Sequence, residues 1–264
     1  MTGEICRFGL IVTGRGEAKF LQLLFRSLMV RAWCSFEVIR RVGQLSPITS
    51  PKRVLKMVGR GGNVTPKDVE NIGLPARGFL RQHAQNVVIL VDDLEADRQP
   101  QAEAVFRRYR DALDQVLRSD NLCDRAAVHF LVNMLEAYYF AHAAVVNGVA
   151  GMQLLDADHP SDVEQIRNPK ADLRQRWPGF DEIEHGEQIV GSLDLDHVLS
   201  RPPECCWLRA MFAWCVDKLV ARGALYEPLG PGTYRLDSGC KSPLTYPQAT
   251  GVEHTNTGTS IGVV

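Results

Sequence analysis

The stretch "NVVILVDDLEADR", residues 86–98, contains five consecutive apolar residues followed by four carboxylates within six positions. The apolar run Val87–Val91 is typical of a strand that a parallel sheet buries on both faces. The carboxylates that follow it are Asp92, Asp93, Glu95 and Asp97. Carboxylates this close repel one another unless water or a cation separates them. Either the segment is a well-solvated loop, or a positively charged group belongs beside it.

Strands and helices alternate along the chain on both sides of this segment. Apolar, β-rich runs predict three further strands, at residues 6–14, 36–42 and 126–134. Apolar residues at helical spacing predict amphipathic helices over residues 17–33 and 100–119. Such alternation favours an α/β fold, a parallel sheet flanked by helices.

The pattern changes after residue 150, and the chain divides into three predicted regions. Residues 1–150 form the α/β domain, and residues 151–229 form a mainly helical extension packed on it. Within the extension we expect helices over 186–200 and 207–223, the second ending at Gly223. Residues 230–264 are rich in Gly, Thr, Ser and Pro without periodicity, which predicts an irregular tail.

Composition indicates an ordinary globular protein. The 264 residues are 45% hydrophobic and 23% charged. A net charge of -1 provides no overall basic field, so a nucleic-acid partner would have to bind a local patch. Seven cysteines without a CxxC pair favour free thiols in a reducing cytosol. We find neither a signal peptide nor an apolar run long enough to cross a membrane, and therefore expect a soluble, cytoplasmic protein without a membrane partner.

Acidic residues are predicted at several strand ends of the sheet. Glu17 follows the first strand, the acidic cluster follows the third, and Glu136 follows the fourth. Ligands of open α/β sheets bind at the carboxyl ends of the strands. Mg²⁺ takes oxygen ligands, commonly one or two carboxylates with waters and phosphates, and it polarises a phosphoryl oxygen. Carboxylates from separate strand ends could therefore form a magnesium site.

Each of these acids also has a plainer interpretation. The cluster at 92–97 and Glu17 could be first-turn acids that a helix dipole stabilises in solvent. Glu136 lies in an apolar, aromatic stretch, where an unpaired carboxylate is costly to bury. Gly14 and Gly16 match neither the dinucleotide fingerprint nor the P-loop. The chain also lacks H-E-x-x-H and G-x-S-x-G motifs.

Basic residues concentrate between the second strand and the acidic segment. This part of the chain is rich in Gly and Pro and includes "GRGG" at residues 59–62. A flexible basic segment suits contact with a phosphate backbone, although a solvated loop has the same composition. The residues are Arg40, Arg41, Lys52, Arg53, Lys56 and Arg60.

Three segments together resemble a known family. "IVTGRGEAKFLQLLFRSL" resembles the opening motif of TOPRIM-like proteins, "VVILVDDLEADR" their D-x-D strand end, and "VNMLEAYYFAH" the E-a-W-type segment that follows. The later stretches "NPKADLRQRWPGFDEIEHGEQIVGSLDLDHV" and "WLRAMFAWCVDKL" look like the second half of a bacterial domain-of-unknown-function family in that group. The resemblance covers roughly residues 6 to 220.

The resemblance implies a Rossmannoid TOPRIM-like domain with a Mg²⁺ or Mn²⁺ site that acts on nucleic-acid phosphodiesters, as nucleases of the overcoming-lysogenization-defect type do. It also implies a phage-defence or mobile-element setting and an AAA/SMC-like ATPase partner. The implied catalytic residues are Glu17, Asp92 and Asp93. The implied metal ligands are Glu17, Asp92, Asp93, Glu95, Asp97 and Glu136. The predicted phosphate contacts are Arg15 and Lys19, beside the acids, together with Arg53, Lys56 and Arg60 of the basic segment.

One departure from the family pattern leaves the function open. Thr13 stands where the family opening has its first glutamate, and a threonine hydroxyl cannot take a proton at neutral pH. The first hypothesis is a metal-dependent endonuclease, and the second is a TOPRIM-like binding or scaffold module that does not cut. A phospho-receiver or flavodoxin-like domain is a third hypothesis, but the first strand ends in Thr13-Gly14 and not in an acidic pair.

Overall fold

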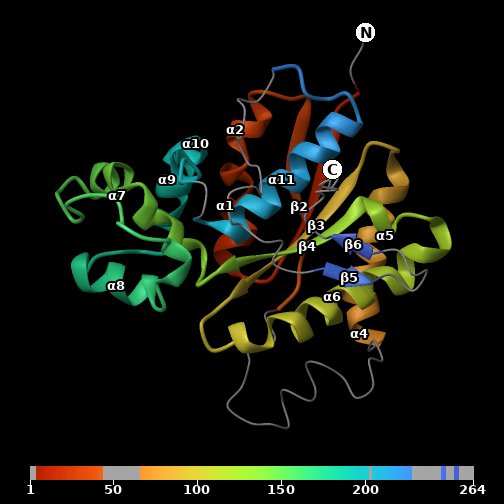
Figure 1. The fold of residues 1–264 in the computed structure, drawn as a ribbon, viewed down its shortest axis with the longest axis horizontal. Coiled ribbons are helices and arrows are strands. Elements are labelled where there is room, and N and C mark those ends of the chain that lie inside the picture. Colours follow the sequence, from red (N-terminus) through yellow and green to blue (C-terminus); the bar gives the residue numbers. More distant parts are fainter. Residues whose placement is uncertain (1–3, 44–65, 202–203, 228–244, 248–252, 256–264) are drawn as a thin grey trace, which may run out of the picture.

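A four-stranded parallel sheet forms the centre of the protein (Figure 1). The computed structural model describes residues 4–43, 66–201, 204–227, 245–247 and 253–255. The strands are β1 (Cys6–Val12), β2 (Cys34–Arg41), β3 (Val87–Leu94) and β4 (Ala126–Val132), in the order β2-β1-β3-β4. All three pairings are parallel, so the predicted α/β class with a parallel sheet is confirmed.

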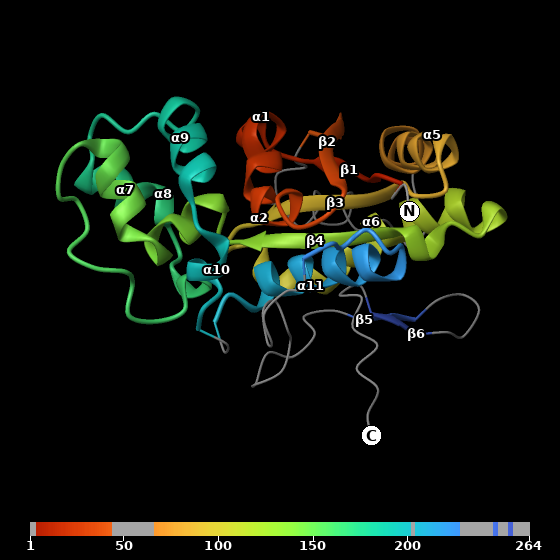
Figure 2. The ribbon, with the colours of Figure 1, turned by 90° about the horizontal axis from the view of Figure 1, so that it is seen from above.

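Helices cover both faces of the sheet (Figure 2). One face packs against α1 (Arg15–Leu24), α2 (Arg26–Met29) and α11 (Cys206–Ala221). The other packs against α5 (Leu74–Gln82) and α6 (Ala102–Leu117). Successive residues of β3 point to alternate faces, which is why its continuous apolar sequence contributes to both cores.

Short helices complete the described chain. Before α6 these are α4 (Pro66–Asp68), the π-helix η1 (Val69–Gly73) and η2 (Gln99–Gln101). After α6 they are η3 (Arg118–Asp120), η4 (Cys123–Arg125), η5 (Leu135–Ala141), α7 (Ala143–Ala150), η6 (Val163–Gln165), α8 (Pro169–Arg176), α9 (Glu184–Ser192) and α10 (Leu195–Val198). Among the described residues, we find no helix with the length and apolar character needed to span a bilayer.

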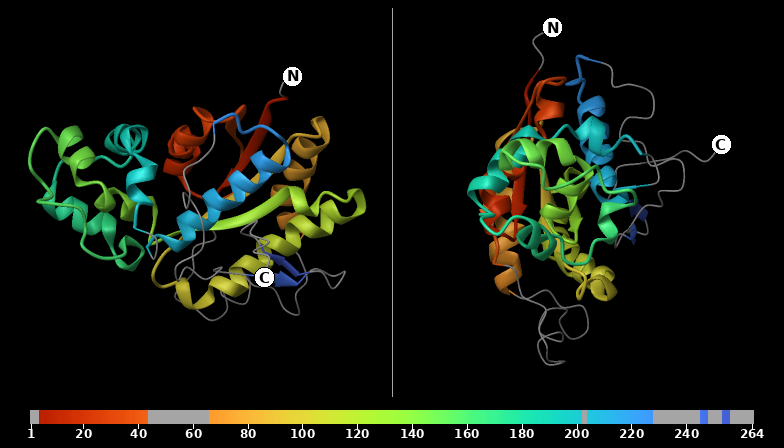
Figure 3. Two further views of the ribbon diagram at one scale, coloured as in Figure 1. Left: turned by 45° about the horizontal axis from the view of Figure 1, so that its top comes forward. Right: turned by 90° about the vertical axis from the view of Figure 1, so that its left-hand side faces the viewer.

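The chain after β4 first forms helices beyond the carboxyl end of the sheet and then returns across one face. Helices α7, α8 and α9 stand beyond the end of β4, and α11 lies along the sheet (Figures 2 and 3). Helix α11 is held by ring contacts: Phe212 stacks on Phe25 at 5.1 Å, and Trp214 meets Phe8 edge-on at 6.5 Å. The apolar core of this face therefore contains side chains from both sides of residue 150.

Several elements differ from the sequence prediction. Strand β3 extends to Leu94, because Asp92 and Asp93 continue the pairing with Phe130 and Leu131 of β4. Both aspartates are thus strand residues, and the solvated-loop interpretation is wrong for them. The predicted helix 17–33 is two helices that meet at Phe25. Within the predicted irregular tail, β5 (Thr245–Pro247) and β6 (Glu253–Thr255) pair antiparallel.

The cysteines also depart from expectation at one position. Cys6, Cys34, Cys123, Cys205 and Cys215 are free thiols. Cys206, at the start of α11, is disulfide-bonded. Burial raises the pKa of Cys205 and Cys215 above the ordinary thiol value, so neither is activated as a nucleophile.

Gly223 ends α11 as predicted, in a left-handed conformation with φ of 61°. The N–H groups of Gly223 and Ala224 donate to the carbonyls of Val220 and Leu219, which is the Schellman arrangement. We expect Gly223→Ala to lower the free energy of unfolding by about 1 kcal/mol, because a Cβ strains this conformation. Gly78→Ala, at an exposed position of helix α5 with open space around the new methyl, should instead raise it by about 0.5–1 kcal/mol. Urea denaturation measures both changes, and equal effects would contradict this account.

Candidate functional site

The two aspartates at the end of β3 point to opposite faces of the sheet. Asp92 follows Val91 and faces α6, where Tyr109 contacts it. Asp93 faces the α1 side, where burial and then the charges of Glu17 and Glu136 raise its pKa. Because strand residues alternate, the pair that is adjacent in sequence is divided between two environments. These two environments have different chemistry.

Asp92 is held in a closed polar network. Its Oδ1 accepts from the Thr13 hydroxyl at 2.7 Å, and its Oδ2 accepts from Arg98 Nη2 at 2.5 Å and from the Tyr109 hydroxyl at 3.1 Å. The side chains of Asp92 and Arg98 are both 0% exposed. Arg98 also donates to the carbonyl of Asp93 at 2.5 Å. The positive group that the acidic segment requires is thus supplied in part by its own Arg98.

Asp93 belongs to a second, open cluster of carboxylates with Glu17 and Glu136. These three side chains are 9%, 6% and 5% exposed. Burial, and then the charge and hydrogen bonding of Glu17, raise the pKa of Asp93 well above its ordinary value. The Oδ1 atom of Asp93 is buried, yet it has no hydrogen-bond partner among the described residues. A buried carboxylate oxygen without a partner, beside another carboxylate, is unfavourable unless a proton or a cation joins the group.

Glu136 is the member of the cluster that already has a cation. Lys170 Nζ, on α8, lies 3.3 Å from Glu136 Oε1 and 2.9 Å from Glu182 Oε2. Burial nevertheless raises the pKa of Glu136, and the charge of Lys170 opposes that shift. The Tyr139 hydroxyl lies in the same group, where burial and the charge of Glu136 raise its pKa well above 10.0. The helical extension therefore contributes directly to the carboxyl end of the sheet.

The start of α1 brings Glu17 to this cluster. Glu17 is the third residue of the helix, and its carboxylate folds back over Gly14, the residue before the helix. A Cβ on Gly14 would lie 1.6 Å from Glu17 Oε2, so only glycine allows this approach. Arg15 and Lys19, the other residues predicted here, are exposed on the same helix.

The backbone before Glu136 is strained. Asn133 has φ of 57°, and Met134 has φ of 77° with ψ of 165°, a region that glycine almost alone occupies. The Asn133 side chain holds this turn by donating to the carbonyl of Glu164 at 2.8 Å and accepting from Gln99 at 3.2 Å. Strained residues that the surroundings enforce concentrate at functional sites.

A groove of about 760 Å³ opens next to the cluster. Glu95 and Asp97, from the loop after β3, line it on one side. Lys170 and Arg174 line it from α8, Arg167 lines it from just before that helix, and Met134 is also part of its lining. Lys170 therefore belongs both to the groove and to the carboxylate cluster.

The structure thus distributes the predicted site residues over several places. It brings together Glu17, Asp93 and Glu136, and it places Glu95 and Asp97 in the groove. Asp92 lies in its own network on the opposite face. Arg53, Lys56 and Arg60 lie outside the described residues.

Several residues of the site carried no recognisable signal in the sequence. These are Arg98, Tyr109 and Glu182, which reach the site only through tertiary packing. The spacing of Arg167, Lys170 and Arg174, three and four residues apart, could have indicated one basic helix face.

Two of the three carboxylates in the cluster could bind a hard cation, and the third is already paired with a lysine. Within the part of the chain that the structure describes, no three His, Cys, Asp or Glu side chains are arranged to hold a metal ion. Glu136 is engaged by Lys170. Glu17 and Asp93 form the remaining pair, with the unpartnered Asp93 Oδ1 available. Two carboxylates completed by waters and phosphates are a usual donor set for Mg²⁺.

Comparison of the chain with protein families, with curated proteins and with solved structures gave no match. The site must therefore be interpreted from its own geometry.

The Asp92 network predicts a large loss of stability when one partner is removed. Asp92→Ala leaves the buried Arg98 guanidinium without its counter-charge and should lower the free energy of unfolding by about 3–5 kcal/mol. The double variant Asp92→Leu, Arg98→Met removes both charges and should lose less than Asp92→Ala alone. Urea denaturation of the three proteins tests this. A double variant less stable than the single variant would show that the ion pair does not dominate.

The Asp93 carboxyl predicts a specific dependence of stability on pH in buffer with a metal chelator. Its raised pKa contributes stability below the unfolded-state value of 3.8, and this contribution is lost as the pH rises through the folded-state pKa. Asp93→Asn removes the repulsion with Glu17 and should unfold at a higher temperature than the wild type at pH 7–8. Near pH 3 the two proteins should differ little. A variant less stable at neutral pH would contradict the assignment.

Proposed function

We propose that Glu17, Asp93 and Glu136 bind a divalent cation and that the protein acts on phosphodiester groups of nucleic acid. The observation that carries this proposal is the buried, unpartnered Asp93 Oδ1 beside Glu17. The resemblance of the strand-end motifs to TOPRIM-like proteins supports the same assignment. Mg²⁺ or Mn²⁺ bound there would polarise a phosphoryl oxygen.

The residues of the chain divide the remaining tasks. Glu17 and Asp93 hold the cation, and Glu136 joins them when its contact with Lys170 opens. Lys170 lines the groove, and once its contacts with Glu136 and Glu182 open it can pair with a phosphate oxygen. Arg98 and Thr13 keep Asp92 in place on the opposite face and take no part in the chemistry.

A second candidate function is binding without cleavage, and the position of Thr13 favours it. The Thr13 hydroxyl donates to Asp92 and not to the carboxylate cluster. A threonine hydroxyl cannot take up a proton at neutral pH, so Thr13 cannot serve as the general base. A site that holds a cation and a phosphate but lacks a general base would bind nucleic acid, or a partner such as an ATPase, and leave it intact. A phage-defence setting stays a prediction of the resemblance.

Cation binding should be visible as stabilisation. With Mn²⁺ or Mg²⁺ at one hundred times its dissociation constant, the wild type should gain about 2.7 kcal/mol of unfolding free energy. Asp93→Asn should show little or no gain, and the control Asp156→Asn, at an exposed acid, should respond as the wild type does. Thermal unfolding with chelator and with each metal measures the gain. Equal stabilisation of all three proteins would refute the assigned ligands.

A nuclease assay on the same three proteins separates the two candidate functions. Plasmid, single-stranded DNA and RNA are incubated with Mg²⁺ or Mn²⁺ and resolved on gels. Cleavage by the wild type and by Asp156→Asn, but not by Asp93→Asn, supports the endonuclease. Cation-dependent stabilisation without cleavage of any substrate supports the binding module instead.

A further inference from the structure

The two walls of the groove beside the cluster carry opposite charges. Arg167 and Arg174 are exposed on the α8 wall, and no described carboxylate lies within ion-pair distance of either. Glu95 and Asp97 form the other wall, and no described cationic side chain pairs with them. The walls do not neutralise each other in ion pairs. Both sets of charges are therefore available to a ligand.

This charge pattern restricts the chemistry of the ligand. A plain polyanion would be attracted by the arginines and repelled by the two acids. A ligand that has phosphates on one side and hydrogen-bond donors on the other satisfies both walls. Carboxylates accept hydrogen bonds from ribose hydroxyls and from the amino groups of bases. Nucleotides with a ribose 2′-hydroxyl provide both features, and the 2′-hydroxyl is what distinguishes RNA from DNA.

The dimensions of the groove limit the ligand further. At about 760 Å³ it falls within the usual range of small-molecule sites, roughly 300–1,000 Å³. A double helix presents its phosphates on a surface much larger than such a pocket. A short single-stranded segment, with its bases and sugars unpaired, can enter it.

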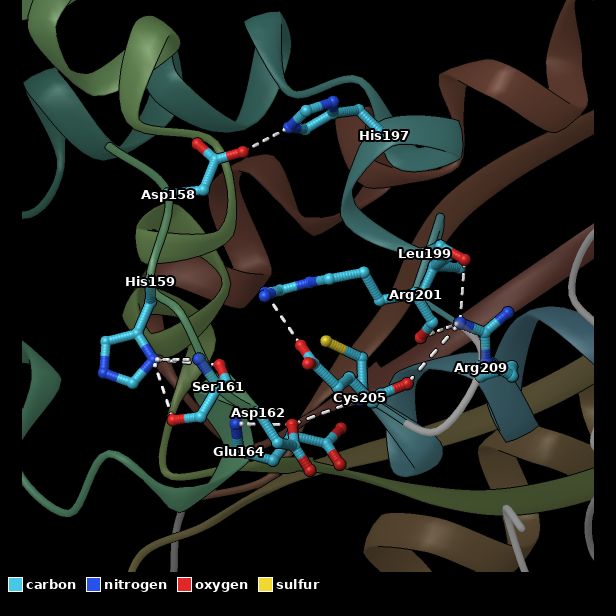
Figure 4. Close-up of polar contacts among 11 residues, drawn as sticks. Asp158, His159, Ser161, Asp162, Glu164, His197, Leu199, Arg201, Cys205 and Arg209 are labelled. Carbon is cyan, nitrogen blue, oxygen red and sulfur yellow. Dashed lines mark hydrogen bonds and ion pairs between the residues drawn. The ribbon is translucent and has the colours of Figure 1, made fainter. Parts of the chain in front are cut away.

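The segment that precedes the α8 wall is anchored before any ligand binds. Asp162 accepts from the backbone N–H of Cys205 at 3.1 Å (Figure 4). Glu164 accepts from the Tyr138 hydroxyl at 2.8 Å and from the N–H of Leu208, at the start of α11, at 3.1 Å. The segment that leads to Arg167 is therefore fixed to the core. A wall held in this way loses little conformational entropy when a ligand binds.

We propose that this groove binds single-stranded RNA, with phosphates on Arg167 and Arg174 and with ribose hydroxyls or base amino groups on Glu95 and Asp97. The inference deepens the proposed function and rests on it for the chemistry that follows binding, since Lys170 joins the groove to the carboxylate cluster. Binding itself requires no metal.

Calorimetric titration in chelator-containing buffer tests the inference separately from the cation site. The probes are a 5′-phosphorylated tetra-adenylate RNA, the DNA of the same sequence, and inorganic pyrophosphate. We expect the RNA to bind at least about 5-fold more tightly than the DNA, because only RNA offers 2′-hydroxyls to the acidic wall. Pyrophosphate should bind more weakly than either.

Charge variants of the two walls test the role of each wall separately. Arg167→Glu with Arg174→Glu should weaken RNA binding by about 10-fold or more, whereas Arg176→Glu, on the same helix but outside the groove, should change it less than about 2-fold. Glu95→Gln with Asp97→Asn should remove the preference for RNA over DNA.

Three results would overturn the inference. The first is that RNA and DNA bind equally well to the wild type and bind more tightly, by the same factor, to the Glu95→Gln, Asp97→Asn protein. That result would show that the acidic wall only repels phosphates. The second is pyrophosphate binding as tight as that of RNA, which shows a simple anion site. The third is equal weakening by Arg176→Glu. Failure of the cation test above, with RNA binding intact, would refute the proposed function but not the groove.

Discussion

The buried ion pair between Asp92 and Arg98 is the interaction on which the rest of the site depends. Both side chains are fully buried, so each needs hydrogen-bond partners inside the protein, and Thr13, Tyr109 and the carbonyl of Asp93 add to the contacts that the two side chains make with each other. These contacts join the end of β1, the end of β3, the loop that follows β3, and α6. The loop is turned back at Arg98, which leaves Glu95 and Asp97 facing the groove. A buried charge that has lost its partner is costly, so this geometry is closely specified.

Unfavourable features collect close by, at the carboxyl ends of β3 and β4. Glu17 and Asp93 lie together with an unpartnered oxygen, and Met134 holds a conformation that suits glycine. Over most of the sheet, apolar strands are buried on both faces, as their sequences predict. Natural sequences depart from such agreement mainly at functional sites, where ligand binding can offset the unfavourable free energy. This contrast separates a structural carboxylate, Asp92, from a candidate ligand, Asp93, although the two are neighbours in sequence.

The helical extension completes the site as well as covering the sheet. Lys170 brings a positive charge to Glu136, and the basic residues beside it form one wall of the groove. None of these positions follows a strand, so the rule that ligands bind at strand ends could not indicate them. The order of elements and the parallel sheet were predictable because periodicity is a local property. The assignment of Asp92 was not, since its partners Arg98 and Tyr109 lie six and seventeen residues away.

By itself, the sequence determined the class of fold and the candidate acids. Continuous apolar strands can only be buried on both faces, and the residues that follow them must meet at one edge of a parallel sheet. Only the tertiary structure decided which acids act together. The direction of a side chain at a strand end depends on where the strand stops, and β3 continues through Asp92 and Asp93 because β4 pairs with it there. That pairing directs the Asp92 side chain toward Arg98 and the Asp93 side chain toward Glu17, and no local pattern in the sequence predicts these directions.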